Sequence, residues 1–216
     1  MIIKYLGHSS FLIKSKGSTI ITDPFDEEMV GLKFPKTESD IVTISHHHKD
    51  HDQIKNIKGT PLIIDWPGEF EKNDIRVFGY NTFHDSEKGA KRGQNVLYKF
   101  ESEGITILHC GDLGDVPDQK LIDEIGDIDI LMVPVGGFYT IDAEAAKELC
   151  IKIEPSIIIP MHFNHDKLNQ KTFKELSPVD EFLKKMGSEK KEPLEELKVT
   201  KEELVDEESK VIVMKF

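Results

Sequence analysis

The amino-acid sequence predicts a layered α/β sandwich, and two observations carry that prediction. Short apolar runs typical of strands occur in both halves of the chain, separated by Gly, Pro, Asn and Asp. Helical patterns lie between the later runs. Many strands with interspersed helices favour sheets covered by helices, and 216 residues are enough for one sizeable core. Because no repeat or boundary stands out, we expect a single domain over residues 1–216.

Each predicted element follows from its local pattern. Strands are expected at residues 2–6, 11–14, 19–22, 41–45, 62–65 and 75–83, and then at 96–101, 106–109, 130–133, 156–160 and 211–215. Helices are expected at residues 119–125, 142–153 and 178–186. Pro178 suits the first helical position after a Ser177 cap, and either Thr140 or Asp142 could cap the preceding helix.

Two further segments have less regular patterns. Residues 25–36 carry Phe25, Met29 and Phe34 without a period, so we expect either a mobile flap over a pocket or a surface loop. Residues 187–210 are more than half charged. Such a charge run predicts a solvated loop with a short helix before the last strand.

The composition limits the classes of partner. A formal net charge of −12 argues against long nucleic acid or an anionic membrane as the main partner. Cys110 and Cys150 are too few for a disulfide framework, which favours the reducing cytoplasm. The N-terminus reads as a strand rather than a signal peptide, and no apolar run approaches the roughly 20 residues of a membrane span. We therefore expect a cytoplasmic protein that acts on a small molecule.

The densest chemical signal is SHHHKDHD at residues 45–52, directly after an apolar run. Side chains alternate in an extended segment, so His46 and His48 point the same way. Asp50 and His51 follow where a helical turn is expected, at a neighbouring point. Imidazole and carboxylate together suit zinc, and also iron or manganese. Because these four residues cannot fill two coordination shells, further ligands must come from elsewhere in the chain.

Further ligand candidates lie just past the ends of other predicted strands. They are His84, Asp112 and His162. Functional loops gather at strand ends in α/β folds, so these side chains are expected to meet the histidine cluster.

In order, SHHHKDH, His84, the Gly-Asp of HCGDLG and the histidine of PMHF resemble the metal motifs of the metallo-β-lactamase superfamily. More narrowly, the chain resembles the compact ascorbate-phosphate-lactonase-like branch of that superfamily. Supporting segments are YLGHSSFLI near the N-terminus, ITDP at 21–24, WPGEFE at 66–71 and VPVGGFYTIDAEAA at 133–146. The resemblance covers nearly the whole chain.

The resemblance implies a four-layer αββα sandwich with the site at one edge of its two sheets. It also implies two divalent metal ions, zinc before manganese or iron. The implied ligands are His46, His48 and His84 for the first ion, Asp50, His51 and His162 for the second, and Asp112 as a bridge. Flavo-diiron relatives place an acid where His48 stands, which argues against oxygen-reducing chemistry.

Such a pair of ions can share a hydroxide and stabilise negative charge in the transition state. The expected reaction is hydrolysis of a small ester-like substrate, such as a lactone, by a metal-bound hydroxide. Asp112, His8 and His109 are the candidates for passing a proton to the leaving group. A phosphodiesterase acting on a small phosphodiester or nucleotide is the alternative enzyme. A non-catalytic metal-binding module is the third hypothesis.

Several polar residues have both a functional and a structural interpretation. His8 could line the site or orient a ligand, or serve a turn. Asp23 could orient a ligand imidazole or belong to an ordinary Asp-Pro turn. His109 lies within a strand, where a buried structural role competes with a role in the site. His47 and Asp52 are expected at the surface or at a helix cap.

Two loops are candidates for contact with substrate. The amides of residues 136–140 and the following helix N-terminus could receive an anionic oxygen, with Tyr139 and Thr140 as contact residues, or form only a helix-entry loop. The basic tip at 91–95 could contact a phosphate or be a solvated turn. His165 could reach substrate but is expected to be structural.

Overall fold

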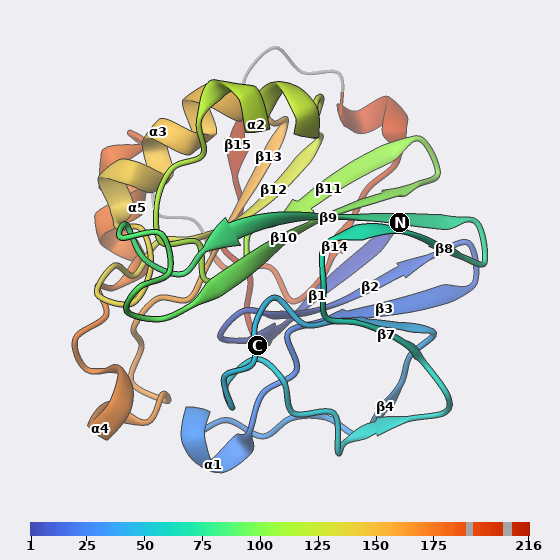
Figure 1. The fold of residues 1–216 in the computed structure, drawn as a ribbon, viewed down its shortest axis with the longest axis horizontal. Coiled ribbons are helices and arrows are strands. Elements are labelled where there is room, and N and C mark those ends of the chain that lie inside the picture. The colour runs from blue at the N-terminus through green and yellow to red at the C-terminus, as the bar shows by residue number, and fades with distance from the viewer. Residues whose placement is uncertain (189–191, 205–208) are drawn as a thin grey trace.

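Two β-sheets lie face to face in the computed structural model, which describes residues 1–188, 192–204 and 209–216 (Figure 1). The first sheet has, in spatial order, β14 (Leu197–Lys198), β1 (Ile2–Gly7), β2 (Ser10–Ser15), β3 (Ser18–Thr22), β5 (Ile41–Thr43) and β7 (Leu62–Ile64). The second has β15 (Lys210–Val211), β13 (Ile157–Met161), β12 (Ile130–Pro134), β11 (Ile105–His109), β10 (Gln94–Ser102), β9 (Ile75–Phe83) and β8 (Gly68–Lys72). A separate short pair joins β4 (Thr37–Glu38) to β6 (Ile57–Lys58).

One apolar core fills the space between the sheets. Ile20 and Ile41 of the first sheet share a buried cluster with Val77 and Ile107 of the second. Burial of each such side chain contributes about 1.5–3 kcal/mol. The Tyr98 hydroxyl of β10 lies 3.1 Å from carbonyl oxygens of the first sheet's edge, at Ile44 and Ile64. This contact ties the sheets together directly beneath the loop that carries the histidine cluster.

Helices cover the outer face of the second sheet (Figure 1): α2 (Gln119–Ile125), α3 (Ala143–Ile153) and α5 (Val179–Lys185). Their apolar residues Ile122, Leu149 and Phe182 are buried in the same cluster as the sheet. The αββα sandwich requires a second outer layer, on the first sheet.

That outer layer is thin and contains two short helices, α1 (Glu27–Val30) and α4 (Gln170–Phe173). In β3 and β5, Ile20 and Ile41 face the core between the sheets, so the next residue in each strand points to the outer face of the first sheet. There Val42 packs in a second cluster with Phe25, Val30 and Phe34. The four-layer prediction is confirmed. Residues 25–36 lie at the surface with Phe25, Val30 and Phe34 buried beneath them, and motion of the segment as a flap stays a prediction.

The boundaries of several elements differ from those predicted. Strands β4, β6 and β14 and helices α1 and α4 were not expected, since each has too few residues for a period to show. Strand β8 was missed because its sequence, GEFEK, is mostly charged. The last strand is Lys210–Val211 rather than 211–215. Pro178 occupies the N-cap of α5 without a side-chain cap, so the predicted Ser177 cap is wrong. Asp142, not Thr140, caps α3 by accepting from two backbone amides.

The charged segment 187–210 contains β14 and a short 3₁₀ helix at Lys201–Leu204. The short helix predicted for this segment is therefore present. Residues 189–191 and 205–208 lie outside the described residues.

The direction of the strands determines which edge of the sandwich carries the candidate site. Strand β3 runs parallel to β5, and β11, β12 and β13 are parallel to one another. The carboxyl ends of parallel strands meet at a common edge, where their loops converge. The loops after β5, β9, β11 and β13 carry the predicted metal ligands.

Candidate metal centre

The fold brings all seven predicted ligands to one edge of the sandwich. Their ligand atoms form overlapping groups within 4.8 Å of one another: His46, His48 and His84; His46, His51 and Asp112; and Asp50, His51 and His162 with His8. The first and last of these groups contain the two sets of three ligands that the resemblance implies, the last with His8 in addition, and the middle group joins Asp112 to one histidine of each set. His51 belongs to two groups, so the sets adjoin.

Asp112 lies at the centre of the cluster. Its Oδ2 is 3.3 Å from Nε2 of His84 and 3.3 Å from Nε2 of His162. Its Oδ1 is 3.2 Å from Nε2 of His51, and Nε2 of His46 is 4.0 Å from Oδ2. One carboxylate therefore faces imidazoles of both sets, which is the placement that a bridging ligand requires.

The buried polar atoms fit divalent cations. Within the described part of the chain, Nε2 of His46, His51 and His162 and Oδ1 of Asp112 have no hydrogen-bond partner. Leaving such atoms buried and unsatisfied costs about 1–3 kcal/mol each. A divalent ion would satisfy them together, and imidazole with carboxylate is a donor set suited to zinc.

Charge in the cluster supports the same conclusion. Burial alone would raise the pKa of the Asp112 carboxyl, but the His162 and His51 imidazoles hold that pKa well below its usual range. Burial alone would lower the pKa of His51, whereas Asp112 and Asp50 raise it well above the usual value. The cluster therefore attracts positive charge, which a cation can supply in place of a proton.

Asp23 holds two ligand imidazoles from behind. Its fully buried carboxylate accepts from Nδ1 of His51 at 2.8 Å. It also accepts from the Ser45 amide at 2.7 Å and from the Ser45 hydroxyl at 2.6 Å. The hydroxyl in turn lies 2.9 Å from Nδ1 of His46. With Nδ1 donating on both rings, each Nε2 presents a lone pair to the centre. Asp23 thus has the orienting geometry expected, and Ser45 joins it.

Asn95 was missed as a site residue. The sequence placed it in a basic hairpin tip, but it is fully buried in β10. Its Oδ1 accepts from the Asp112 amide at 2.9 Å, while its amide group donates to the Cys110 carbonyl at 3.0 Å and to Thr82 Oγ1 at 2.9 Å. These bonds hold the turn that presents Asp112. A lone asparagine in a strand pattern gives no sequence signal of that role.

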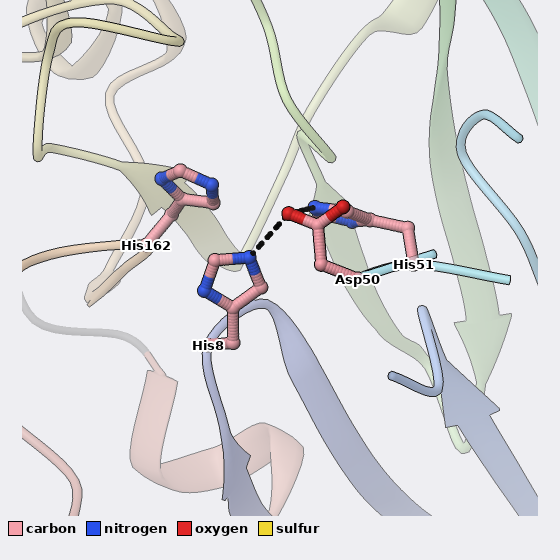
Figure 2. A group of neighbouring side chains, drawn as sticks. All are labelled: His8, Asp50, His51 and His162. Carbon is pink, nitrogen blue, oxygen red and sulfur yellow. Dashed lines mark hydrogen bonds and ion pairs between the residues drawn. The ribbon is translucent and has the colours of Figure 1, made fainter. Parts of the chain in front are cut away.

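His8 lies against the second ligand set, between His162 and Asp50 (Figure 2). Its Nε2 is 3.1 Å from Oδ2 of Asp50, and its ring centre is 4.2 Å from that of His162. Its carbonyl accepts from the Tyr5 hydroxyl and the His162 amide. Burial, followed by the charge of His162, lowers the pKa of His8 to about 4. A buried neutral ring donating to a ligand carboxylate favours an orienting role.

The His109 ring forms hydrogen bonds with backbone groups. Its Nε2 donates to the Ser9 carbonyl at 2.7 Å, and its Nδ1 accepts from the Gly111 amide at 3.3 Å. Both ring nitrogens are engaged and the residue is fully buried, so the geometry favours the structural alternative over proton transfer.

A cavity of about 430 Å³ opens onto the ligands. Its lining includes His48, His84, Asp50 and Asp112 together with Met29, His47, Lys49, Arg92, Tyr139, Thr172 and Phe173. Volumes of this order suit small-molecule ligands. The ligand cluster is therefore accessible to a small substrate.

The other loop candidates contribute unequally to this cavity. Tyr139 lines it, but its hydroxyl donates to the Thr172 carbonyl at 3.0 Å. The Thr140 hydroxyl donates to Ile141 O, and Thr140 is not among the lining residues. Asp142 accepts from the Glu144 and Ala145 amides of α3, so these two amides are not offered to an anionic oxygen.

The remaining histidines lie at the margins. His47 is exposed, with Nδ1 3.6 Å from Asp52 and Nε2 3.4 Å from Asp65. The His165 ring packs 4.4 Å from that of Phe216 and does not line the cavity. None of the helices in the described ranges is long and apolar enough to cross a membrane.

A face-to-face αββα sandwich with adjoining His/Asp ligand sets at one edge defines a metallohydrolase architecture. The family described as beta-lactamase superfamily domain matches residues 2–162. The chain belongs to the metallo-β-lactamase superfamily, and it is a metal-dependent hydrolase of that superfamily.

Known proteins agree with this membership. A UPF0173 metal-dependent hydrolase of Lysinibacillus sphaericus is 31% identical over 195 residues, covering 76% of this chain and 86% of the relative. A Thermotoga maritima structure, provisionally described as a Zn-dependent hydrolase of the metallo-β-lactamase superfamily, aligns with TM-score 0.81 and 38% identity over 99% of this chain and 97% of that chain. A metallo hydrolase from Ignicoccus hospitalis, at TM-score 0.65 and 22% identity over 99% of this chain and 94% of that chain, shares the fold.

Proposed function

We propose that this protein hydrolyses a small ester-like substrate such as a lactone, using two divalent ions, with zinc before manganese or iron. One observation carries the proposal: buried, unsatisfied imidazole and carboxylate atoms surround Asp112 and open onto a cavity of about 430 Å³. The proposed ligands are His46, His48 and His84 for one ion, Asp50, His51 and His162 for the other, and Asp112 between them. Residues 1–216 would act as one domain.

The bound ions would supply Lewis acidity and an acidified water as nucleophile. Asp112 faces both proposed ligand sets, so its carboxylate is the group placed to pass a proton to the leaving group. Met29, Tyr139 and Phe173 form an apolar wall that limits water around the substrate. His8 and Asp23 would keep Asp50 and His51 in orientation.

A lactone is favoured by the small cavity with its apolar wall and by the resemblance to lactonase-like relatives. The second candidate is hydrolysis of a small phosphodiester, because Arg92 and Lys49 line the same cavity. The net charge of −12 disfavours long nucleic acids for either reaction. The buried free thiols of Cys110 and Cys150 support a cytoplasmic location.

The test joins metal content to turnover. Elemental analysis of untagged protein should find about two ions per chain, as a paired site requires, and fewer in His48→Ala and Asp112→Asn. The loaded protein is then assayed against panels of lactones and of phosphodiesters. Turnover of lactones alone supports the proposal, and turnover of phosphodiesters alone supports the second candidate. Absence of metal uptake by folded protein refutes both.

A further inference from the structure

A second cavity, of about 350 Å³, adjoins the cavity that opens onto Asp112. The two cavities share the lining residues His47, His48 and Arg92. His46 also lines the second cavity, so two of the three candidate ligands for the first ion border it. The cavities therefore meet at His48, and a molecule whose reactive bond lies beside Asp112 has room to extend into the second one.

Trp66 gives the second cavity an exposed aromatic side chain. Five large apolar side chains are exposed in the described ranges, and Trp66, at 53% exposure, is the one among them that lines a cavity with candidate metal ligands. A single exposed apolar side chain on a convex surface is ordinary, whereas a cavity beside a reactive centre is where ligands bind. The indole is therefore placed to contact a bound molecule.

The backbone that carries the indole is fixed against β9. At Gly79 of β9, an added Cβ atom would lie 3.1 Å from the Trp66 carbonyl oxygen and 3.0 Å from Cα of Pro67. The absence of a side chain at Gly79 therefore lets residues 66 and 67 pack directly on the strand. The Trp66 ring in turn contacts the Phe70 ring of β8, with ring centres 5.6 Å apart and planes at 70°. Because backbone and ring are held before a ligand arrives, little conformational entropy is lost on binding.

The rest of the second cavity supplies hydrogen-bonding groups around the indole. His47 and Asp65 line it as a pair, with Nε2 of His47 3.4 Å from Oδ2 of Asp65. The side-chain amide of Gln94, at the start of β10, has no hydrogen-bond partner within the part of the chain that the structure describes. An apolar ring bordered by polar groups matches a planar ligand ring, which has apolar faces and an edge open to hydrogen bonds.

We propose that this second cavity is a subsite for a planar aromatic group of the substrate, which stacks on the Trp66 indole. The bond to be hydrolysed would then lie beside Asp112, with His48 between the two positions. This subsite rests on the proposed function, and it narrows the substrate class to small esters or lactones that carry an aromatic ring.

The experiment uses the indole itself as the reporter. Trp66 is the single tryptophan of the chain, so fluorescence excited where tyrosine does not absorb comes from this side chain alone. The protein, as purified, is titrated with two tetrahydrofuran ethers that cannot be hydrolysed, one carrying a phenyl ring and the other a cyclohexyl ring. The two ethers have the same number of carbon atoms and differ in planarity. Calorimetry measures the affinity, and fluorescence shows whether the ring lies against Trp66.

Three variants separate stacking from general apolar contact. Trp66→Leu keeps an apolar side chain but removes the indole, and Trp66→Phe restores a smaller ring. Phe138→Leu is the matched control, because Phe138 is 58% exposed and lines neither cavity. Lactones carrying the same phenyl and cyclohexyl groups are then assayed for KM in wild type and in the three variants.

Wild type should bind the phenyl ether about 2- to 10-fold more tightly than the cyclohexyl ether, the range expected for one stacked aromatic pair. The phenyl ether should also change the Trp66 fluorescence in a saturable way. Trp66→Leu should lose the preference, Trp66→Phe should recover part of it, and Phe138→Leu should match wild type. KM for the phenyl lactone should rise in Trp66→Leu by a similar factor.

Equal affinities for the two ethers in wild type would overturn the subsite, and so would a preference that survives in Trp66→Leu. Binding of the phenyl ether that leaves the fluorescence unchanged would also overturn it, because the ring would then bind away from the indole. If the ethers behave as expected but no lactone is hydrolysed, the subsite stands and the proposed reaction fails. If lactones are hydrolysed with no preference between phenyl and cyclohexyl groups, the proposed reaction stands and the subsite fails.

Discussion

Substitution of Asn95 tests whether one buried amide holds the bridging carboxylate. In Asn95→Ala the Asp112 amide and the Cys110 carbonyl both lose their side-chain partner inside the protein. The bond to Thr82 Oγ1 is lost as well. Each buried backbone group left unsatisfied costs about 1–3 kcal/mol. Two such groups predict a loss of about 3 kcal/mol in the free energy of unfolding, a large share of the 5–15 kcal/mol typical of domains.

The same change should weaken metal binding. Asp112 reaches both ligand sets, so a looser turn moves one carboxylate away from several imidazoles at once. Loss of a group that orients a ligand typically lowers metal affinity about 10- to 100-fold. Urea denaturation of the metal-free protein measures the stability term. Competition with a chromogenic chelator measures the affinity.

Thr82→Val is the matched control for Asn95→Ala. It removes the threonine hydroxyl that bonds Asn95 but leaves the contacts with Cys110 and Asp112 in place. Because two hydrogen bonds are lost, it should cost about 2 kcal/mol, at roughly 1 kcal/mol each, and keep the wild-type metal affinity. Asn95→Asp, which can accept from Asp112 but cannot donate to Cys110, should fall between the two. Wild-type metal affinity in Asn95→Ala would refute the reasoning.

Three further predictions concern the surrounding framework. Asp23→Asn removes the charged acceptor of His51 and should lower metal affinity about 10- to 100-fold; unchanged chelator competition would contradict it. Removal of the bound metal ions by a chelator should lower the melting temperature of the protein in calorimetry, because ions at 100 times their dissociation constant stabilise the folded state by about 2.7 kcal/mol. An identical melting curve with and without chelator would count against a metal site formed by the folded protein. The Met29 amide holds the pKa of Asp26 below its unfolded value. The stability that the ionised Asp26 carboxylate gives the folded protein is therefore complete above about pH 4, and it is lost as pH falls through the folded pKa of Asp26. The asparagine in Asp26→Asn keeps the cap without titrating. Urea denaturation should therefore show that the free energy of unfolding of wild type exceeds that of Asp26→Asn by less below about pH 4 than above it. A difference that is constant with pH would exclude Asp26 as the source of this pH dependence.

That the candidate ligands lie together could be predicted because metal-binding residue types and strand ends coincide in them. Residues 45–52 combine metal-binding side chains in one short stretch after a buried strand. His84, Asp112 and His162 follow other strands, and parallel strands bring such positions to one edge. The long strands β9 and β10 were predicted for a different reason. Both are apolar, β-rich runs, and the prediction matched β9 over its full length and β10 over residues 96–101.

Asn95 and Ser45, unlike Asp23 and His8, could not be predicted as supporting residues because their partners are distant in sequence. Asn95 bonds Asp112 across 17 positions, and Ser45 bonds Asp23 across 22. Neither contact changes the local hydrophobic pattern. The same limit applies to residues 25–36, whose phenylalanines are buried only because β5 offers them a second apolar face.

Backbone strain shows how firmly the fold sets the ligand positions. His8, Asp23 and His162 have φ values of 57°, 39° and 52°, in the left-handed region that non-glycine residues rarely occupy. Such conformations cost of order 1–3 kcal/mol each and persist only where the surroundings over-determine them. Here the surroundings are specific. The His162 amide donates to the His8 carbonyl at 2.8 Å, and the Asp23 amide donates to Thr43 O at 2.9 Å. Backbone bonds therefore hold the turns that carry His162 and the two residues, His8 and Asp23, that lie against the proposed ligands.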